Sequence, residues 1–301
     1  MNWLDYGATL TDDALIDSQV KEYLTFFLEN GYVVIPGNTD FLEKISRATT
    51  CFYKFKENNR AITKPIQDDN GFLRRIVNLH CYNTEIVELF TENPSLSFLD
   101  YLMGEATLYT SLTFEKGSGQ DIHRDTPYFW TSPPYQYVGM WVALEDTDKE
   151  NGPLRVVKGG HKLPELDLES IASKFYDSMS DINPYSDELW LEYQTQLQTQ
   201  YQAAGLTEQE VHVPKGSTII WHPQLPHGGS PIVNDNRTRL SMAMHITPPN
   251  VAVYHQDVFF SQKIVPSKKE IFYKFDKNRR YIAHDTISFG HLKDYRFKDI
   301  L

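Results

Sequence analysis

The first part of the chain carries apolar residues at helical spacing. Acidic residues follow Thr11, a residue type that caps helix N-termini, and Gly31 ends the segment as glycine commonly does. The apolar positions that share one helical face are Val20, Tyr23, Leu24, Phe27 and Leu28. We therefore expect an amphipathic helix between Thr11 and Gly31, a short strand at YVVIPG (32–37) and helical segments around 40–58 and 84–103.

Beyond about residue 105 the pattern changes to short apolar runs that are rich in β-branched residues. Gly, Pro, Asn and Asp separate these runs, as expected for turns between strands. The runs are ATLYTSLTF, YVGMWVALED, PLRVVKG, EVHVPKGSTIIWH and RTRLSMAMHIT. Many short strands with this punctuation predict a β-sandwich or a barrel.

A polar stretch interrupts the strand pattern between residues 163 and 208. Ser186 is suited to cap a helix that ends at Gly205. One face of that helix carries Trp190, Tyr193, Leu197 and Tyr201. An insertion between core strands is often a lid over a binding site.

No linker of Pro or Ser divides the chain, so we expect a single domain over residues 1–301. Its parts would be a helical region at about 1–104, a strand core at about 105–250 that contains the 163–208 insertion, and a C-terminal extension at 251–301. The extension includes the locally basic run SKKEIFYKFDKNRRYIAHD, which we interpret as a solvated helix face.

Composition narrows the classes of partner. The net charge is -11, which disfavours a general affinity for nucleic-acid phosphates or anionic membranes and leaves small molecules as the expected partners. Cys51 and Cys81 are too few for a disulfide framework and lack the paired spacing of a zinc site. The N-terminal segment is acidic and has no apolar stretch, so we expect neither a signal peptide nor a membrane span, and a cytoplasmic setting.

Three residues have the chemistry of a metal site. His123 and Asp125 stand two apart where a strand-like run meets a turn, and residues i and i+2 of a strand project from the same face. His227 follows a later strand-like run and precedes two glycines, and His222 in the same stretch is a rival. Two imidazoles and one carboxylate on one face of Fe(II) leave the opposite face open for a co-substrate and dioxygen.

A second cluster lies twelve residues after His227. Arg239 and Ser241 share a face of the last strand-like run, where a guanidinium fork and a hydroxyl group can bind a carboxylate together. A dicarboxylate co-substrate needs one end on the metal and the other end on such a clamp. A surface strand arginine is the alternative interpretation of Arg239.

The stretch MWVALEDTDKENGPLRVVKGGHK (140–162) resembles the W-x-A-L-x-D…E-N-G-x-L…G-S-H-K segment of the phytanoyl-CoA dioxygenase-like superfamily of Fe(II)/2-oxoglutarate oxygenases. HRDTPYFW precedes it and HGGSPIVNDNRTRLS follows it in the same order as in that family. The resemblance implies a double-stranded β-helix (jelly roll, cupin-like) core flanked by N-terminal helices. It also implies Fe(II) on His123, Asp125 and His227, with 2-oxoglutarate and dioxygen as co-substrates.

The resemblance also assigns the co-substrate contacts. It implies that Arg239 binds the far carboxylate of 2-oxoglutarate, with Arg237 as a competitor because the interval from the last histidine is one residue longer than in several relatives. Trp141 matches a tryptophan beside the co-substrate, and Thr110 occupies a position of polar co-substrate contact. His222 matches a position that lines the pocket.

The resemblance implies a hydroxylase that acts on an unactivated C–H bond, here expected to belong to a small metabolite, and that releases succinate and CO2. Retention of Asp125 argues against halogenation, whereas desaturation, ring closure and epoxidation use the same triad. A cupin-like isomerase or epimerase and a non-catalytic ligand-binding protein are the other hypotheses. The candidate substrate contacts are Tyr128, Phe129 and Trp130 after the triad and Arg74, next to Arg75 and His80, upstream of it.

Overall fold

The computed structural model describes residues 17–262, 271–290 and 293–300. Over this part of the chain the helices are α2 (Ser18–Asn30), α3 (Thr39–Asn58), α4 (Arg60–Thr63), α5 (Thr84–Thr91), α6 (Leu96–Met103), α7 (Leu168–Ala172), α8 (Asp187–Ala203) and α9 (Gln256–Ser261). None of these helices is long and apolar enough to span a membrane.

The strands begin with β1 (Tyr32–Ile35), β2 (Ile76–Val77), β3 (Thr107–Phe114), β4 (Trp130–Ser132), β5 (Val138–Ala143), β6 (Leu154–Val157), β7 (Glu208–Val211) and β8 (Thr218–Trp221). They continue with β9 (His227–Gly229), β10 (Ser241–Thr247), β11 (Ala252–Tyr254), β12 (Tyr273–Asp276), β13 (Arg279–Ile282), β14 (Thr286–Phe289) and β15 (Lys293–Arg296). The predicted combination of helices before residue 105 and strands after it is confirmed.

The first helix follows from its caps. The Asp17 side chain accepts hydrogen bonds from two backbone N–H groups of the first turn, and Gly31 adopts φ 84°, a left-handed conformation that suits glycine. The part of the predicted helix between Thr11 and residue 16 lies outside the described residues. The predicted insertion helix is α8, in which the Ser186 hydroxyl accepts a hydrogen bond from the Leu189 N–H.

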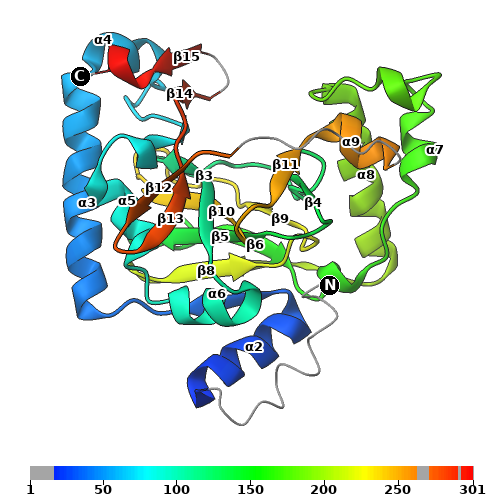
Figure 1. The fold of residues 1–301 in the computed structure, drawn as a ribbon, viewed down its shortest axis with the longest axis horizontal. Helices are drawn as coiled ribbons and strands as arrows, with labels where there is room; N and C mark the ends of the chain where they lie inside the picture. Colours follow the sequence, from blue (N-terminus) through cyan, green and yellow to red (C-terminus); the bar gives the residue numbers. More distant parts are fainter. Residues whose placement is uncertain (1–16, 263–270, 291–292, 301) are drawn as a thin grey trace.

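Most strands join one large sheet in the order β1-β8-β5-β10-β3-β2-β14-β15, and β13 also pairs with β3. A smaller sheet has the order β7-β6-β9. At the centre of the large sheet β10 lies antiparallel between β3 and β5, with Ser241 opposite Phe114 and Ala143. Figure 1 shows α3 and the α7–α9 group on opposite sides of the sheets.

The two faces of the large sheet have different partners. Met140 and Met242 point outward into the main hydrophobic core, which includes apolar side chains of α3 and α5. Residues of opposite parity, such as Trp141 and Ile219, pack against Val156 of the smaller sheet. The space between the two sheets is therefore lined by alternate residues of β3, β5, β8 and β10.

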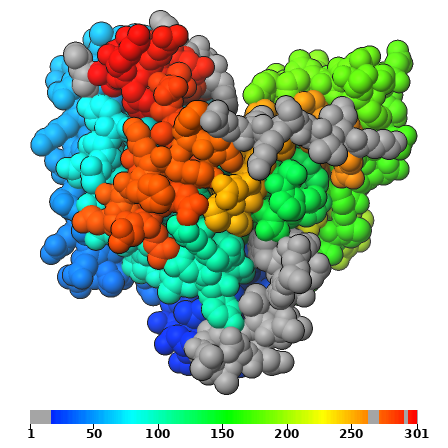
Figure 2. All heavy atoms as spheres, viewed as in Figure 1, coloured from blue at the N-terminus to red at the C-terminus, as the bar shows by residue number. Residues whose placement is uncertain are grey.

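The interpretation of the basic C-terminal run as a helix face is wrong for its described part. Residues 273–282 form the β12–β13 hairpin, which turns at Lys277 and Asn278 with φ 47° and 62°. Alternating aromatic and charged residues on each side of this turn favour a hairpin, and Arg279 makes two hydrogen bonds of 2.6 and 2.7 Å to Asp100 at the end of α6. In the space-filling view the hairpin lies over the α5–α6 region, on the other side of the molecule from the α7–α8 insertion (Figure 2).

Two buried histidines, His80 and His161, make the stability of the fold depend on pH. Burial lowers the pKa of His80 to about 3 and that of His161 to about 4. Between pH 6.5 and 4 these imidazoles are neutral in the folded protein and protonated in the unfolded chain. The unfolded state therefore binds more protons, and stability decreases as the pH falls through this window.

We predict that the free energy of unfolding of the metal-free protein is lower at pH 5 than at pH 7, by on the order of 1 kcal/mol per pH unit for each histidine. Urea unfolding at the two pH values measures this difference. His80→Gln should reduce the dependence on pH, whereas His212→Gln, at a side chain that is 48% exposed, should preserve it. Equal unfolding free energies at pH 5 and pH 7 would contradict the prediction.

Candidate metal centre and its surroundings

His123 and His227 lie side by side because their backbones are paired. The His123 N–H donates to the His227 carbonyl over 2.8 Å, and the His227 N–H donates to the His123 carbonyl over 2.9 Å. This antiparallel bridge extends the smaller sheet beyond β9. It brings two histidines from distant parts of the sequence to one position.

The two glycines after His227 allow this close approach. A Cβ atom on Gly228 would lie 2.6 Å from the Gln120 carbonyl oxygen, and one on Gly229 would lie 3.0 Å from the Gly119 nitrogen. Any side chain at these positions would push away the segment that leads into His123. The pairing of the His123 and His227 backbones therefore requires glycine at positions 228 and 229.

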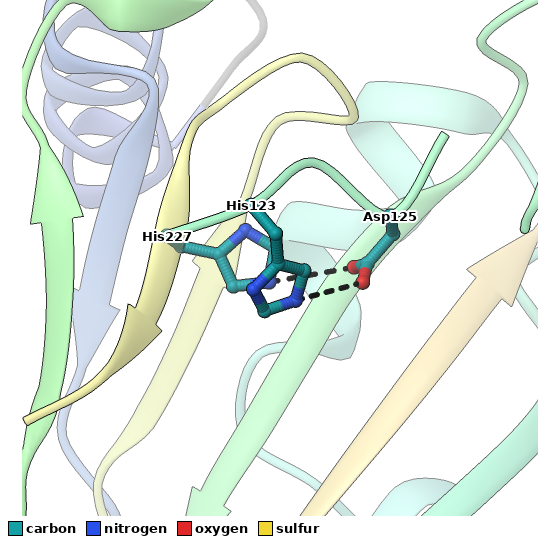
Figure 3. Close-up of side chains that lie close together, drawn as sticks. All are labelled: His123, Asp125 and His227. Carbon is teal, nitrogen blue, oxygen red and sulfur yellow. Dashed lines mark ion pairs between the residues drawn. The ribbon is translucent and has the colours of Figure 1, made fainter. Parts of the chain in front are cut away.

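Hydrogen bonds orient both imidazoles. The Nδ1 atom of His123 lies 2.7 Å from the Asp121 carbonyl oxygen, and the Nδ1 atom of His227 lies 3.0 Å from the Leu225 carbonyl oxygen. A carbonyl oxygen only accepts, so each Nδ1 carries the proton and each Nε2 presents a lone pair. Both Nε2 atoms lie 3.4 Å from Asp125 carboxylate oxygens (Figure 3).

One potential ligand atom from each of His123, Asp125 and His227 lies within 4.8 Å of the others, an arrangement that can hold a metal ion. Burial alone would raise the pKa of Asp125, but the neighbouring His227, His245 and His123 hold that pKa well below its usual value. Burial lowers the pKa of His227 to about 4, against the opposing effect of the Asp125 charge. Near neutral pH these two groups therefore have the protonation states that metal ligation requires.

His245 of β10 is a neighbour of the triad that the sequence analysis did not select. Its Nε2 atom lies 3.1 Å from Asp125 Oδ2, and its ring stacks on Phe129 with centroids 4.3 Å apart. The sequence pattern could have indicated His245, because Arg239, Ser241 and His245 stand at alternate positions of one strand-like run and so face the same side. The same Oδ2 atom lies 3.4 Å from His227 Nε2, so the His245 contact would help to orient the Asp125 carboxylate toward a bound metal.

Arg239 is buried in the space between the sheets. Its side chain donates a hydrogen bond of 2.6 Å to the Gly152 carbonyl, and its guanidinium carbon lies 5.9 Å from the Phe114 ring centre and 5.6 Å from that of Trp141. Burial lowers the pKa of Arg239 to about 10, so the group remains a cation near neutral pH. Its Nε atom has no hydrogen-bond partner among the described residues.

Arg237 has a different environment. Its side chain is 33% exposed, and it forms ion pairs with Asp148 at 2.9 Å and Glu150 at 3.3 Å. These surface carboxylates already neutralise the guanidinium group. Of the two arginines, only Arg239 combines burial with an open hydrogen-bond donor.

The remaining predicted co-substrate residues border Arg239 or line the same sheet face. Trp141 lies against the guanidinium group, and the Ser241 hydroxyl donates a hydrogen bond of 3.3 Å to the Arg239 carbonyl. The Thr110 hydroxyl donates to Asn78 Oδ1 over 2.7 Å. The rival His222 makes other contacts. Its Nδ1 accepts a hydrogen bond from the Gln224 N–H, and its ring packs beside His161.

Aromatic residues surround the triad on the insertion side. The Trp190 ring of α8 lies 5.8 Å from that of His123 and 4.5 Å from that of Tyr128. Phe129 lies on His245, as described above, whereas Trp130 packs into the hydrophobic cluster of the insertion next to Phe259. Tyr128 and Phe129 therefore border the candidate site, and Trp190 is a further wall residue that the sequence analysis assigned only to a helix face.

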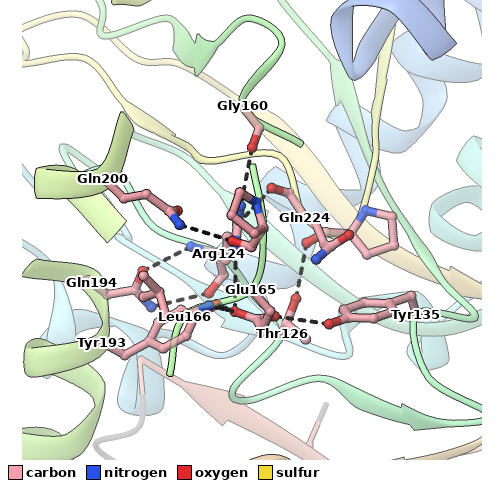
Figure 4. A network of polar contacts seen from close by, with 12 residues as sticks. Arg124, Thr126, Tyr135, Gly160, Glu165, Leu166, Tyr193, Gln194, Gln200 and Gln224 are labelled. Carbon is pink, nitrogen blue, oxygen red and sulfur yellow. Dashed lines mark hydrogen bonds and ion pairs between the residues drawn. The ribbon is translucent and has the colours of Figure 1, made fainter. Parts of the chain in front are cut away.

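The insertion is attached to the residue between the two candidate ligands. The Gln194 side chain of α8 accepts a hydrogen bond of 3.0 Å from the Arg124 N–H and donates one of 3.3 Å to the Arg124 carbonyl. The Arg124 side chain is fully buried and donates to the carbonyls of Gln224 and Gly160. Figure 4 shows these contacts converging on Arg124.

Glu165 completes this network. One of its carboxylate oxygens lies 3.6 Å from Arg124 Nη1 and accepts the Tyr193 hydroxyl at 2.9 Å, and the other accepts the Tyr135 hydroxyl at 2.9 Å. A fully buried charge such as that of Arg124 is stable only when such partners are present. The position of α8 over the triad and the spacing of His123 and Asp125 are therefore linked.

We predict that Gln194→Met lowers the affinity of the metal-free protein for Co(II) about tenfold, because Met keeps the side-chain length but removes both hydrogen bonds to Arg124. Calorimetric titration measures the affinity, and circular dichroism checks the fold. Gln202→Met is the matched control at an exposed position of the same helix. Equal Co(II) affinities of Gln194→Met and the wild type would contradict the prediction.

The chain is similar to the proteins of one family. The model of the phytanoyl-CoA dioxygenase (PhyH) family matches residues 27–240. The peroxisomal phytanoyl-CoA dioxygenase of Mus musculus is 30% identical over 119 residues, and that of Rattus norvegicus is 29% identical over 119 residues. Each match covers 38% of this chain but only 29% of the length of the relative.

Solved structures share the fold at low sequence identity. The epimerase SnoN in complex with Fe3+, alpha ketoglutarate and nogalamycin RO has a TM-score of 0.57 at 16% identity, over 89% of this chain and 99% of that one. The carbocyclase SnoK has a TM-score of 0.58 at 16% identity, over 85% and 94%. EctD from S. alaskensis with 2-oxoglutarate and 5-hydroxyectoine has a TM-score of 0.54 at 17% identity, over 79% and 78%.

The match of the family model extends over more than half of the chain and confirms the family resemblance of the sequence motifs. The chain belongs to the phytanoyl-CoA dioxygenase (PhyH) family, whose members use Fe(II), 2-oxoglutarate and dioxygen.

Proposed function

We propose that the protein is an Fe(II)- and 2-oxoglutarate-dependent oxygenase that hydroxylates an unactivated C–H bond of a small metabolite. The observation that carries this proposal is Arg239, a buried cation whose Nε atom has no hydrogen-bond partner among the described residues. The charge of Glu145 acts on this guanidinium group, but the two form no ion pair within 4 Å in the described part of the chain. An arginine that is removed from water without a counter-ion is costly, by several kcal/mol. The far carboxylate of 2-oxoglutarate would supply that counter-ion.

The position of Arg239 relative to the triad supports the same role. Arg239 lies over Trp141, Trp141 and Trp221 belong to one hydrophobic cluster, and Trp221 lies 4.6 Å from the His227 ring. This series of contacts connects the clamp to a candidate ligand through apolar side chains. A cupin-like isomerase that holds only a metal would have no use for a buried cation here.

In this proposal His123 and His227 bind iron through Nε2 and Asp125 binds it through a carboxylate oxygen. When bound, iron with 2-oxoglutarate and dioxygen supplies the oxidation that replaces C–H by C–OH, with succinate and CO2 as coproducts. The Asp121 and Leu225 carbonyls keep both imidazoles in the ligating tautomer.

The other residues position the co-substrate and exclude water. The Arg239 fork and the Ser241 hydroxyl, once it turns from the Arg239 carbonyl, would bind the far carboxylate. Trp141 and Phe114 cover the guanidinium group, and Thr110 would contribute a polar contact on the same sheet face. Tyr128 and Phe129 would form walls for the reacting substrate.

We also propose that the two sheets form a double-stranded β-helix and that the whole chain is one domain. The strand orders support this proposal, because β8-β5-β10-β3 would form one sheet and the His123 segment, β9, β6 and β7 the other. The triad would then lie at the edge where the two sheets meet.

Succinate formation tests the function. The wild-type protein, reconstituted anaerobically with Fe(II) and exposed to 2-oxoglutarate, a metabolite library and then oxygen, should form one succinate per molecule of product, and Asp125→Ala should form none above background. A hydroxylated product is heavier by one oxygen atom, whereas a desaturated or cyclised product is lighter by two hydrogen atoms. Turnover of a library compound without succinate would refute the proposal and favour a non-redox isomerase.

A further inference from the structure

A cavity of about 510 Å³ adjoins the candidate site where β2 meets β3. Its lining includes Leu73, Arg74, Arg75, Phe114, Ser118 and Gln120. Phe114 is the same ring that lies over Arg239, and Gln120 precedes His123 by three residues. The cavity therefore borders both the clamp and the segment that carries the first candidate ligand.

The strand register places Arg75 on the cavity side. Ile76 pairs with Thr113, and the Ile76 side chain is fully buried in the main hydrophobic core. Alternation along the strand turns the preceding residue, Arg75, to the opposite face, where Phe114 also points. Both observations agree with the presence of Arg75 in the cavity lining.

Arg75 is partly buried, and neither it nor the exposed Arg74 has an ion pair or hydrogen bond from its side chain within the described ranges. Burial lowers the pKa of Arg75 without any opposing charge effect. The nearby carboxylates that could pair with Arg75 already have other partners. Glu115 accepts from Lys56 at 2.7 and 2.8 Å and from the Leu73 N–H at 2.7 Å.

Asp68 has a partner as well. Lys116 lies 3.1 Å from Asp68 and 3.2 Å from Asp235, so both carboxylates already have a cationic partner. Two adjacent arginines thus face a cavity in a protein whose net charge is -11. Guanidinium groups without counter-ions at a partly buried position attract carboxylates and phosphates, which they bind through paired hydrogen bonds.

We propose that the substrate carries an oxyanionic group, a carboxylate or a phosphate, and that Arg75 binds this group with the help of Arg74. The inference rests on the proposed oxygenase function and names the class of its substrate. The Gln120 amide and the Ser118 hydroxyl provide further donors along the same wall. Anchored there, the substrate extends past Phe114 toward the triad, so that the anion determines which carbon is presented.

Matched pairs of ligands test the inference. Benzoate with benzamide, and phenyl phosphate with phenol, differ in charge but share a ring that suits the aromatic walls. Each is titrated calorimetrically, under anaerobic conditions, into protein loaded with Fe(II) and saturated with 2-oxoglutarate, so that Arg239 is already occupied. We expect at least one anion to bind tenfold or more tightly than its neutral partner, and the stronger anion identifies the carboxylate or the phosphate source.

The variants assign the effect to the arginines. Arg75→Gln should remove the preference for the anion, and Arg75→Lys should restore part of it. Arg60→Gln should leave it unchanged, because Arg60 is exposed and forms an ion pair with Glu57. Equal binding of charged and neutral partners, no binding of either anion, or an unchanged preference in Arg75→Gln overturns the inference. The visible absorption band of the Fe(II)–2-oxoglutarate chelate is recorded in parallel, and its absence from the wild type would instead refute the oxygenase function.

Discussion

The paired backbone of His123 and His227 is the constraint on which the rest of the site depends. Two hydrogen bonds fix the register of strands that are far apart in sequence, and both imidazoles consequently project to one side. The approach is close enough that Gly228 and Gly229 cannot carry side chains. Asp125 completes the triad because it follows His123 by two residues and so returns to the same face.

Two opposite charges lie in this interior, and neither has an oppositely charged Asp, Glu, Lys or Arg side chain within 4 Å among the described residues. Asp125 is surrounded by imidazoles that keep its pKa low, and Arg239 lies between aromatic rings with one donor open. A metal cation would neutralise the first, and a dicarboxylate chelated to that metal would reach the second. Both features would be costly in a core that binds nothing, and each fits one of the two ligands of the proposed function.

The insertion adds a second level of organisation. Gln194 binds the backbone of the residue between the two candidate ligands, and Trp190 of the same helix lies beside His123 and Tyr128. The insertion and the candidate metal site are consequently connected through the same three residues, 123–125. In such an arrangement the substrate walls keep their position relative to the metal.

Local patterns predicted much of this structure, and long-range packing accounts for what they missed. Helical spacing and caps indicated α2, α3 and α8, and ordered motifs indicated the triad. The helix assigned to the basic C-terminal run was wrong in its described part, because the charges of Arg279 and Arg280 belong to a hairpin that pairs with β3 and with acids near α6.

The sequence indicates other contacts of the site only weakly or not at all. His245 shared the strand face of Arg239 and Ser241, a signal that alternation could have revealed. Gln194 gave none, since a glutamine on a helix is ordinary until the helix is placed against Arg124. The choice between Arg239 and Arg237 likewise needed burial and the Asp148 ion pair, neither of which the sequence contains.

The central claim is that the triad and Arg239 together bind iron and 2-oxoglutarate. Its most direct test is an anaerobic titration of 2-oxoglutarate into Fe(II)-loaded protein, followed by the visible band of the chelate. The account predicts a saturable band in the wild type and in Arg237→Gln, at least tenfold weaker 2-oxoglutarate binding in Arg239→Gln, and no band in Asp125→Ala. Wild-type affinity in Arg239→Gln together with lost affinity in Arg237→Gln would contradict it.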